Sequence, residues 1–434
     1  MNITSQARLV TVGAGLAAAL LSAAVAGPAT AGETSTEGTN RLVALSDVDG
    51  SQSAERPTIN GSAQVASHDG RYVAFATPSP LVPEDDNGLS DVYVRDTVAG
   101  RTTLVSVSPA GAVGNGDSFE PTVSSSGAVV AFTTTATNLV PDANGDVLDV
   151  VVTDLDEDTM SLVSVRSDGS QAGRNSFFPV ISGDGTAVAF QSFGRFARKD
   201  DDRREDAYVH YESGRTFLAS QNPRGENIPS SLLVGDISDD GLWVVFGNDN
   251  NVWLRDVARR QTRVVWHEGN DPAQPCPMGS VGRPVISGDA RFAAFTTMST
   301  SILKNEKRHL CDVFRVNLVT GKVKRVSVAP DGSQADDHSF IPSLSRNGRY
   351  VGFSSFADNL VPGDIPGSDV YVRDVRTGTT YLASVGVDGP ANQDSGRTAV
   401  AISGDGRTLV YESYASNLVA SDTNERNDVI AWRR

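Results

Sequence analysis

Short runs rich in Val, Ile, Thr, Tyr and Phe alternate along almost the whole chain with segments rich in Gly, Asn, Asp and Pro. Apolar and β-branched runs bounded by turn-forming residues are typical of β-strands. No window of the sequence keeps the apolar period of an amphipathic helix, so we expect very little helix. The pattern therefore predicts an all-β protein.

The runs are organised into a repeat that occurs seven times between Ser62 and Arg434. Its clearest copy is Pro342–Asp374, which is followed by a last run at Thr379–Val385. Every copy contains a tetrapeptide similar to Ser-x-Asp-Gly, and these begin at Ser67, Ser124, Ser182, Ser238, Ser287, Ser345 and Ser403. The starts lie 57, 58, 56, 49, 58 and 58 residues apart. A nearly fixed period of this length indicates a repeat architecture.

Each copy has four candidate strands. The first is clearest in Pro121–Ser124, and the other three are clear in the first copy, at Tyr72–Phe75, Asp91–Asp96 and Thr102–Val107. The Ser-x-Asp-Gly segment between the first two strands has the side-chain chemistry of a tight turn, with a Gly free to take positive φ. Four antiparallel strands repeated around an axis form the blades of a β-propeller. The aromatic residue that recurs in the second strand, such as Phe75, is expected in the core.

The two ends of the chain predict how the propeller closes. The seventh copy stops at Arg434, at the end of its third strand, whereas Arg41–Ser46 resembles a fourth strand. We therefore expect a single seven-bladed β-propeller of four-stranded antiparallel blades over residues 41–434. Its N-terminal strand should lie beside Val429–Trp432 and complete blade 7, which removes an open sheet edge.

Residues 1–31 have the features of a secretory signal peptide. Arg8 precedes the apolar stretch Leu9–Ala26, and Ala29–Ala31 supplies a small-x-small cleavage signal. We expect cleavage before Gly32, a linker over residues 32–40, and a mature protein that is secreted, or periplasmic if the source has that compartment. A retained membrane anchor is the alternative, but no later apolar run is long enough to span a bilayer.

The formal net charge of −16 limits the classes of partner. An acidic surface repels nucleic acid and anionic membranes at long range, so neither is expected as a ligand. Cations, a basic partner or a locally basic binding site remain compatible with this charge. We expect a monomer.

The two cysteines, Cys276 and Cys311, are an even count in a chain that is expected to be exported. We predict that they form one disulfide, and the alternative is two free thiols. In the propeller interpretation, Cys276 lies in the loop that enters blade 5 and Cys311 in the loop between its second and third strands. Both loops emerge on the same face of a propeller.

Four segments of the last two copies resemble the WD40-like, TolB-type (PD40) propeller repeats of exported bacterial proteins. They are Asn359–Asp364, Asp369–Asp374, Leu382–Val385 and Ser403–Gly406. The resemblance covers about residues 41–434. It implies a propeller fold and, since family members commonly act as binding scaffolds, a binding role. The TolB protein itself has an extra amino-terminal α/β domain, where this chain has only residues 32–40.

The two faces of such a propeller differ in their loops. The loops from second to third strand and from fourth strand to the next blade are long and polar, and they form what we call the long-loop face. The tight turns on the opposite side form the short-turn face. Because function concentrates on loops held by a rigid scaffold, we expect an unknown protein or anionic ligand to bind on the long-loop face.

Carboxylate and amide side chains cluster in the loops between second and third strands. The candidates are Asp85, Asn87 and Asp91; Asp142, Asn144, Asp146 and Asp149; and Asp422, Asn424 and Asp428, with Asp364 and Asp369 as a smaller group. Oxygen ligands at alternate positions suit Ca²⁺, the one cofactor that the sequence suggests, although no Glu closes the loop at the twelfth position. The other interpretation is that these side chains cap their own turns and the entrance to the third strand.

Basic residues gather in the corresponding loops of blades 3 and 5, on either side of a shortened fourth copy. They are Arg195, Arg198, Lys199, Arg203, Arg204, Lys304, Lys307 and Arg308. This predicts a basic notch, which would attract an anionic ligand or an acidic protein surface. The alternative is a solvated loop of mixed charge.

No motif indicates catalysis. The chain has no G-x-S-x-G elbow, no H-E-x-x-H and no phosphate-binding loop. Its histidines fall in different copies: His68, His210, His267, His309 and His338. We therefore predict a non-enzymatic binding protein. The alternative is a lyase or hydrolase that acts on extracellular polysaccharide or peptide, and it would need His, Asp or Glu side chains to converge at the channel mouth.

Overall fold

The computed structural model describes residues 38–434 except 62–63, 143, 146, 201, 229–231, 249–250, 268–275, 277–282, 304–309, 364–365 and 425. The described residues belong to one compact unit, and β-strands are its only regular secondary structure. No helix within this part of the chain could span a membrane. The predicted signal peptide, residues 1–31, and most of the predicted linker lie outside the described residues.

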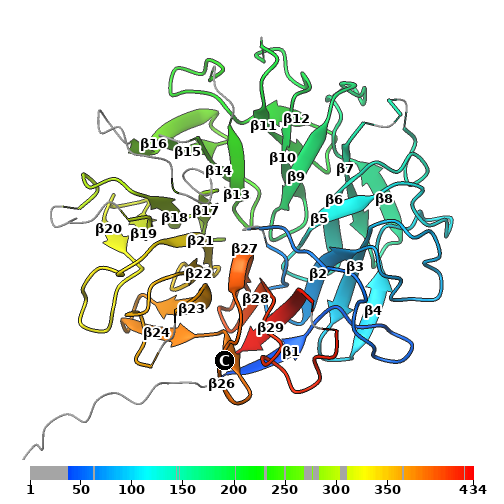
Figure 1. Ribbon diagram of the computed structural model, residues 1–434. Helices are drawn as coiled ribbons and strands as arrows, with labels where there is room; N and C mark the ends of the chain where they lie inside the picture. Colours follow the sequence, from blue (N-terminus) through cyan, green and yellow to red (C-terminus); the bar gives the residue numbers. More distant parts are fainter. Residues whose placement is uncertain are drawn as a thin grey trace, which may run out of the picture. The chain divides into compact units, whose positions relative to one another are not determined.

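Seven antiparallel sheets surround a common axis, as predicted (Figure 1). Strands follow chain order from the axis outward, so each turn connects neighbours in a sheet. Blade 2 contains β5 (Ser118–Val123), β6 (Val129–Thr134), β7 (Asp149–Asp154) and β8 (Thr159–Leu162). Blade 3 contains β9 (Ser176–Ile181), β10 (Ala187–Ser192), β11 (Asp206–Tyr211) and β12 (Thr216–Leu218). Blade 4 contains β13 (Leu233–Ile237), β14 (Trp243–Asn248), β15 (Asn251–Asp256) and β16 (Gln261–His267).

The remaining four-stranded blades follow the same plan. Blade 5 contains β17 (Val285–Ile286), β18 (Phe292–Thr297), β19 (Asp312–Asn317) and β20 (Val323–Arg325). Blade 6 contains β21 (Ser339–Leu344), β22 (Tyr350–Ser355), β23 (Asp369–Asp374) and β24 (Thr379–Leu382). A small hairpin, β25 (Val385–Gly386) and β26 (Gly389–Pro390), leads to blade 7, which begins with β27 (Ser395–Ile402) and β28 (Thr408–Ser413).

Blade 7 is closed by the N-terminal strand, as the sequence predicts. In it β1 (Thr39–Leu42) pairs antiparallel with β29 (Asp428–Arg433), and Leu42 faces Ile430. The Val43 N–H also donates to the Val429 carbonyl oxygen at 3.0 Å. The strand begins at Thr39, two residues before the predicted start, because Arg433 still offers it a main-chain partner.

Blade 1 departs from the plan at the axis. Its sheet contains β2 (Tyr72–Thr77), β3 (Asp91–Asp96) and β4 (Arg101–Leu104). The place of its first strand is taken by two isolated bridges, Thr58 with Ala76 and Ala66 with Val73. Between these bridges the chain has seven residues, 59–65, where β2 has only two, Ala74 and Phe75, so part of this segment is displaced from the sheet.

The core consists of seven hydrophobic clusters, each made by two adjacent blades. The predicted second-strand aromatics supply a fully buried ring to each cluster: Phe75, Phe132, Phe190, Phe246, Phe295, Phe353 and Tyr411. Neighbouring blades approach closely over small residues. At Gly352, for example, a Cβ would lie 2.5 Å from a methyl carbon of Leu409 in blade 7. Blades therefore stabilise one another rather than folding alone.

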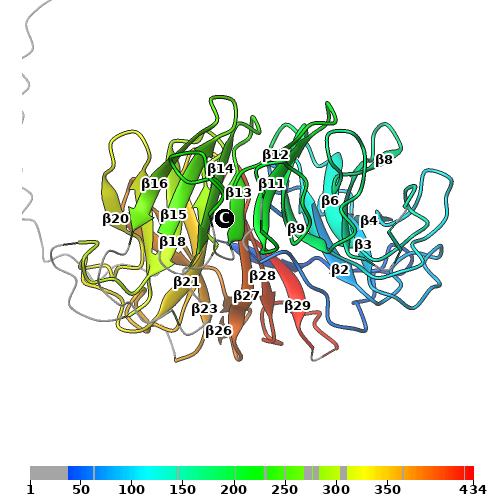
Figure 2. The same cartoon turned by 90° about the horizontal axis from the view of Figure 1, so that it is seen from above.

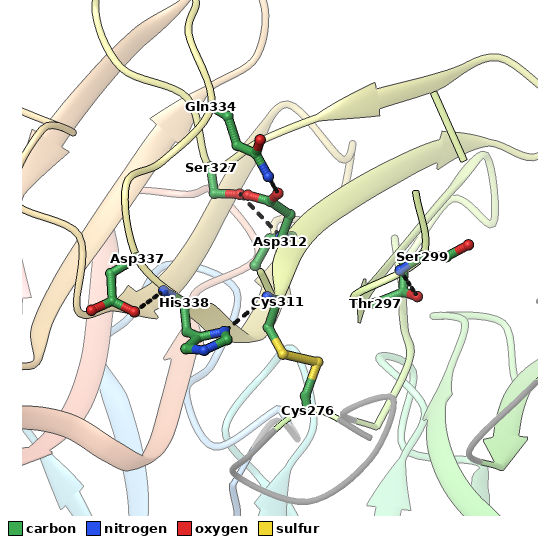
Figure 3. Close-up of a disulfide and its surroundings, with 10 residues drawn as sticks. Cys276, Thr297, Ser299, Cys311, Asp312, Ser327, Gln334, Asp337 and His338 are labelled. Carbon is green, nitrogen blue, oxygen red and sulfur yellow. Dashed lines mark hydrogen bonds between the residues drawn. A yellow bond between two sulfur atoms is a disulfide. The ribbon is translucent and has the colours of Figure 1, made fainter. Parts of the chain in front are cut away.

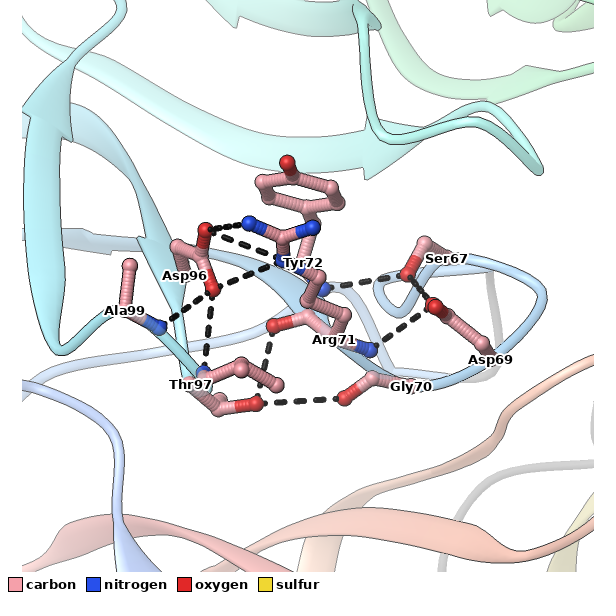
Figure 4. A network of polar contacts seen from close by, with 9 residues as sticks. Ser67, Asp69, Gly70, Arg71, Tyr72, Asp96, Thr97 and Ala99 are labelled. Atoms are coloured by element: carbon pink, nitrogen blue, oxygen red, sulfur yellow. Dashed lines mark hydrogen bonds and ion pairs between the residues drawn. The ribbon is translucent and has the colours of Figure 1, made fainter.

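The Ser-x-Asp-Gly turns behave as their chemistry predicts. In blade 1 the Ser67 hydroxyl donates to Asp69 at 2.8 Å, and Asp69 accepts the Arg71 N–H at 3.0 Å (Figure 4). Gly70 has a φ of 71°, and a Cβ there would overlap Thr408 of blade 7. Arg71 also forms an ion pair with Asp96 at 2.6 Å, which joins this turn to the end of β3.

Main-chain hydrogen bonds join these turns into a closed ring around the axis. One N–H from each turn donates to the next blade, with N···O distances from 2.8 to 3.1 Å. The pairs are His68–Ser125, Ser125–Gly183, Asp184–Asp239, Asp239–Gly288, Asp289–Arg346, Arg346–Gly404 and Asp405–His68. The last pair links blade 7 to blade 1, so the ring reinforces the closure made by β1.

Candidate functional site

The axial channel has one mouth on each face, and Figure 2 shows the sheets from the side with their connections on the two faces. At the short-turn mouth the side chains of the second turn residues point toward the axis from the closed ring. Three of the seven are glycines, Gly183, Gly288 and Gly404, and the others are His68, Ser125, Asp239 and Arg346. The glycines make room for their neighbours. A Cβ at Gly183 or Gly288 would overlap the Asp239 side chain, and one at Gly404 would overlap His68.

Asp239 is the centre of charge at this mouth. Its Oδ2 lies 2.5 Å from Nε of Arg346, although the two residues belong to blades 4 and 6. Burial raises the pKa of Asp239, while Arg346 and His68 act in the opposite direction. The predicted propeller brings all blades to one axis, but the sequence does not show which turn side chains meet there, so this ionic group was not predicted.

A second buried ionic group lies at the long-loop mouth. Glu120 Oε2 accepts hydrogen bonds from the Thr133 hydroxyl at 2.9 Å and from the Phe178 N–H at 2.8 Å. The guanidinium carbon of Arg283 lies 3.4 Å from the centre of the Phe178 ring. Burial lowers the pKa of Arg283 to about 10 and raises the pKa of Glu120. Glu120, Phe178 and Arg283 hold the same repeat position, directly before the first-strand proline. Their different chemistry is therefore a departure from the repeat that the sequence shows.

The displaced segment of blade 1 crosses toward this mouth. The Ile59 N–H donates to Glu412 of blade 7 at 3.1 Å. The Asn60 amide, only 2 % exposed, donates to the carbonyl oxygens of Glu120 at 3.3 Å and Pro179 at 3.2 Å, in blades 2 and 3. The segment therefore ties four blades together beneath the long loops.

Aromatic rings and arginines lie around the long-loop mouth. Phe193, Phe356 and Tyr414 each follow the second strand of their blade, and Phe193 and Tyr414 are 37 % and 39 % exposed. The guanidinium of Arg56 lies 5.5 Å from the Tyr414 ring centre, and that of Arg397 lies 5.8 Å from the Phe356 ring centre. We call these five residues the aromatic–arginine rim.

The carboxylates predicted as Ca²⁺ ligands make the contacts of turn and strand caps. Asn87, Asp142, Asn144, Asp422 and Asn424 belong to loops in which Asx side chains accept main-chain N–H groups two residues on, for example Leu89 N to Asn87 at 2.7 Å. Asp85 is buried and accepts the Tyr93 hydroxyl. Asp146 and Asp364 lie outside the described residues. Metal binding in blades 1, 2 and 7 stays a prediction.

The third strand begins with an Asp in six blades and with Asn251 in blade 4, and in most blades a serine hydroxyl donates to this Asp. In five blades the serine after the fourth strand donates its hydroxyl to this Asp: Ser106–Asp91, Ser164–Asp149, Ser220–Asp206, Ser327–Asp312 and Ser384–Asp369. In blade 7 the serine position is Ala44, and Asp428 instead accepts the Asn424 amide at 3.3 Å. Burial raises the pKa of Asp91 to about 6 and the pKa of Asp428 to about 7.

The loop of blade 3 combines exposed cations with buried carboxylates. Arg195, Arg198, Lys199, Arg203 and Arg204 are exposed, as a basic notch requires. Lys304, Lys307 and Arg308 of blade 5 lie outside the described residues. Within the same loop, oxygens of Asp200, Asp202 and Asp206 lie within 4.8 Å of one another. The sequence interpretation treated this loop as basic and did not identify the acidic group.

The predicted disulfide joins Cys276 to Cys311, with their Cα atoms 5.7 Å apart (Figure 3). It connects the loop entering blade 5 to the residue before β19. Next to it, the Cys311 N–H donates to Nδ1 of His338 at 2.9 Å, and Asp312 accepts the Ser327 hydroxyl and the Gln334 amide. The bridge thus joins Cys276 to the start of β19, next to His338 at the entrance to blade 6.

Comparison with known proteins supports the fold. No protein-family model and no curated protein matches the chain. An oligogalacturonate lyase from Vibrio parahaemolyticus is 12 % identical over 91 % of this chain and 97 % of the lyase, with a TM-score of 0.53. An oligogalacturonate lyase in complex with manganese is 12 % identical over 92 % of this chain and 98 % of the lyase, with a TM-score of 0.53. TolB from Acinetobacter baumannii is 14 % identical over 84 % of this chain and 81 % of TolB, with a TM-score of 0.39. At these identities the lyase similarity shows the seven-bladed propeller fold and nothing about activity, and the TolB value adds no argument.

Proposed function

We propose that this chain is an exported, non-enzymatic binding module that holds an anionic, carboxylate-bearing ligand on its long-loop face. The aromatic–arginine rim carries the proposal. Its arginines, Arg56 and Arg397, have side chains 48 % and 47 % exposed on a chain whose net charge is −16, and each forms an ion pair with one carboxylate, Glu412 at 3.5 Å and Asp394 at 2.9 Å, while part of its guanidinium faces solvent. Exposed arginines on an acidic protein mark the place where an anion is attracted rather than repelled.

The rim suits an extended ligand. Rings such as Phe193 and Tyr414 offer flat apolar faces to sugar rings or peptide planes, while the arginines offer planar donors that match carboxylates. Beneath the rim, hydrogen bonds from Asn60 to the Glu120 and Pro179 carbonyl oxygens, and from the Phe178 N–H to Glu120, join blades 1, 2 and 3, so the surface is held in place before binding. A rigid surface loses little entropy when a ligand binds. The exposed cations of blade 3 extend the positive surface outward.

Calorimetric titration with an acidic oligosaccharide tests the proposal, and oligogalacturonate is a suitable first probe. We expect Arg56→Ala and Arg397→Ala each to weaken binding about tenfold or more, since charge-assisted hydrogen bonds are lost. Arg376→Ala is the matched control, because Arg376 is exposed on the short-turn face. An acidic peptide of equal charge is the second probe. If neither probe binds, or if all three variants bind like the wild type, the rim is not the ligand site.

The alternative function is an enzyme at the opposite mouth, and His68, Asp239 and Arg346 favour it. Asp239 has a raised pKa, and Nδ1 of His68 is buried without a hydrogen-bond partner among the described residues. Incubation with oligogalacturonate, followed by assay of new double bonds and new reducing ends, separates the two functions. Turnover that is lost in both His68→Ala and Asp239→Asn would replace the binding proposal.

Export itself is tested by the mass of the mature protein, which should begin at Gly32.

A further inference from the structure

One blade lacks the amide that other blades place between their loop carboxylates. In blades 1, 2 and 7 an asparagine donates its amide to the Asp that begins the third strand: Asn87 to Asp91 at 2.8 Å, Asn144 to Asp149 at 3.4 Å, and Asn424 to Asp428 at 3.3 Å. Blade 3 has the same spacing as blade 1, but the middle residue is Asp202 in place of an asparagine. A carboxylate therefore stands where the other blades have a hydrogen-bond donor.

The result is three carboxylates in one small space. Oxygens of Asp200, Asp202 and Asp206 lie within 4.8 Å of one another, and Asp200 and Asp206 are only 6 % and 1 % exposed. The donors around them are few. The Tyr208 hydroxyl donates to Asp200 Oδ2 at 2.5 Å, and the Ser220 hydroxyl donates to Asp206 Oδ1 at 2.6 Å. The Asn227 amide donates to Asp206 Oδ2 at 3.3 Å.

Among the described residues, two buried side-chain oxygens at this place have no hydrogen-bond partner of ordinary geometry. They are Oδ1 of Asp200, whose side chain is 3 % exposed, and Oδ1 of Asn227, whose amide already contacts Asp206. The nearest cation to the first is Nε of Arg195 at 3.9 Å, from a side chain that is half exposed. An unpartnered buried acceptor is costly, and more so when it is charged. These oxygens point to a ligand that accepts electron pairs.

Hard divalent cations meet this requirement. Ca²⁺ binds oxygen at about 2.3–2.6 Å, so two of its ligands can lie up to roughly 5 Å apart. The spread of the three carboxylates fits within that limit. Mg²⁺ binds oxygen at about 2.0–2.1 Å and needs a tighter set. A buried proton is the other way to relieve the repulsion, since burial and the neighbouring carboxylates raise the pKa of Asp206 to about 7.

We propose that Asp200, Asp202 and Asp206, together with the side-chain oxygen of Asn227, bind one Ca²⁺ ion in blade 3. The ion takes the role that the asparagine amide has in blades 1, 2 and 7. It joins the loop between β10 and β11 to the loop after β12, which supplies Asn227. The first of these loops also carries Arg195 and Arg204, so the ion orders the blade 3 part of the basic notch.

The repeat itself supplies the test variant. Asp202→Asn gives blade 3 the Asp-x-Asn-x-x-x-Asp pattern of blade 1, so the variant has a local structure that the protein already uses. Asp156→Asn is the matched control, since it removes the same charge from an exposed turn of blade 2. Calorimetric titration with Ca²⁺ and thermal unfolding in EDTA or Ca²⁺ are then compared for the three proteins.

We expect the wild type to bind Ca²⁺ and to unfold at a higher temperature when it is present. Asp202→Asn should bind one ion fewer and should be at least as stable as the wild type in EDTA, whereas Asp156→Asn should match the wild type. Counting ions separates this site from any in blades 1, 2 and 7. A wild type that binds no Ca²⁺, or an Asp202→Asn variant with an unchanged ion count, overturns the proposal.

Terbium luminescence gives a second measurement at the site itself. Tyr208 contacts Asp200, so Tb³⁺ in place of Ca²⁺ should emit when tyrosine is excited. That emission should fall in Tyr208→Phe and in Asp202→Asn, and added Ca²⁺ should compete it away. Emission that is equal in the wild type and Asp202→Asn contradicts the assignment.

Discussion

The two faces of the propeller hold their carboxylates in opposite ways. On the short-turn face, Asp96 and Asp374 are paired with Arg71 and Arg349 at 2.6 Å, and these contacts lower the pKa of both carboxyls to about 2. On the long-loop face, Asp91, Asp206 and Asp428 lie among other carboxylates, and burial, together with these like charges, raises their pKa to between about 6 and about 7. Near the axis, Asp236 and Asp239 also have raised pKa values, because burial dominates there.

This difference follows from what each face has to do. The short turns are regular, and their charges and main-chain ring serve the closure of the fold. The long loops vary from blade to blade, and there the chain keeps buried acidic groups that destabilise it unless a proton, an amide or a cation is supplied. Costly arrangements of this kind are concentrated at sites that bind something.

The largest expected effect is a pH response that differs between the faces. In EDTA, we expect the unfolding free energy to rise by about 3 kcal/mol as the pH falls from 7 to 5. The folded-state pKa of Asp206 and Asp428 is about 7, which exceeds the usual value of 3.8. At pH 7 and above, their ionised forms therefore destabilise the folded protein. As the pH falls below 7 the two carboxylates are protonated in the folded protein, and this cost disappears. Urea unfolding at both pH values measures it.

Asp206→Asn is the control for that response. The variant should show a smaller rise between pH 7 and pH 5, because one of the groups that takes up a proton on folding is gone. A wild-type stability that is flat or falls over this range would show that the loop carboxylates are not destabilising.

The next effect concerns the short-turn mouth. Gly288→Ala should lower the unfolding free energy by about 1–3 kcal/mol, because the new Cβ overlaps the Asp239 carboxylate and disturbs the closed ring. In an Asp239→Ala background the same substitution should cost much less. Chemical denaturation of the four proteins of this double-mutant cycle measures the coupling. Equal costs in both backgrounds would place the strain elsewhere.

The smallest effect concerns the ion pairs of the short turns. Asp96→Asn should destabilise the protein by about 1 kcal/mol at pH 7, since Arg71 is partly exposed and its pair is screened by water. The pKa of Asp96 is lowered by its hydrogen bond from Arg71, so the ionised form contributes stability above about pH 4 that is lost as the pH falls toward 2. The wild type should therefore be more stable than the variant at pH 7, and the denaturation curves of the two proteins should coincide at pH 2. Asp374→Asn in blade 6 repeats the test on an equivalent pair.

Much of the fold could be predicted because it is encoded locally and repeated. The Ser-x-Asp-Gly spacing gives the blade count, the second-strand aromatics give the core, and Arg41–Ser46 gives the closing strand. Two cysteines in loops of the same face give the disulfide. Each of these inferences needs only neighbouring residues or a comparison of copies.

The chemistry of the mouths was less predictable. Glu120 and Arg283 occupy the same repeat position in blades 2 and 5, and their departure from the repeat is visible, but their electrostatic coupling across the channel is not. Asp239 and Arg346 pair across the axis although the whole of blade 5 separates them in the chain. The blade 3 loop reads as basic, yet folding buries Asp200 and Asp206 and leaves its arginines in solvent.

The sequence by itself determined seven blades, their strand order and the pairing of the N-terminal strand with the C-terminal strand, because hydrophobic period and turn chemistry act over a few residues. Only the tertiary structure decided which side chains meet at the axis and which carboxylates lose contact with water. Those outcomes depend on distances between residues far apart in the chain and on desolvation, and both exist only after the ring has closed.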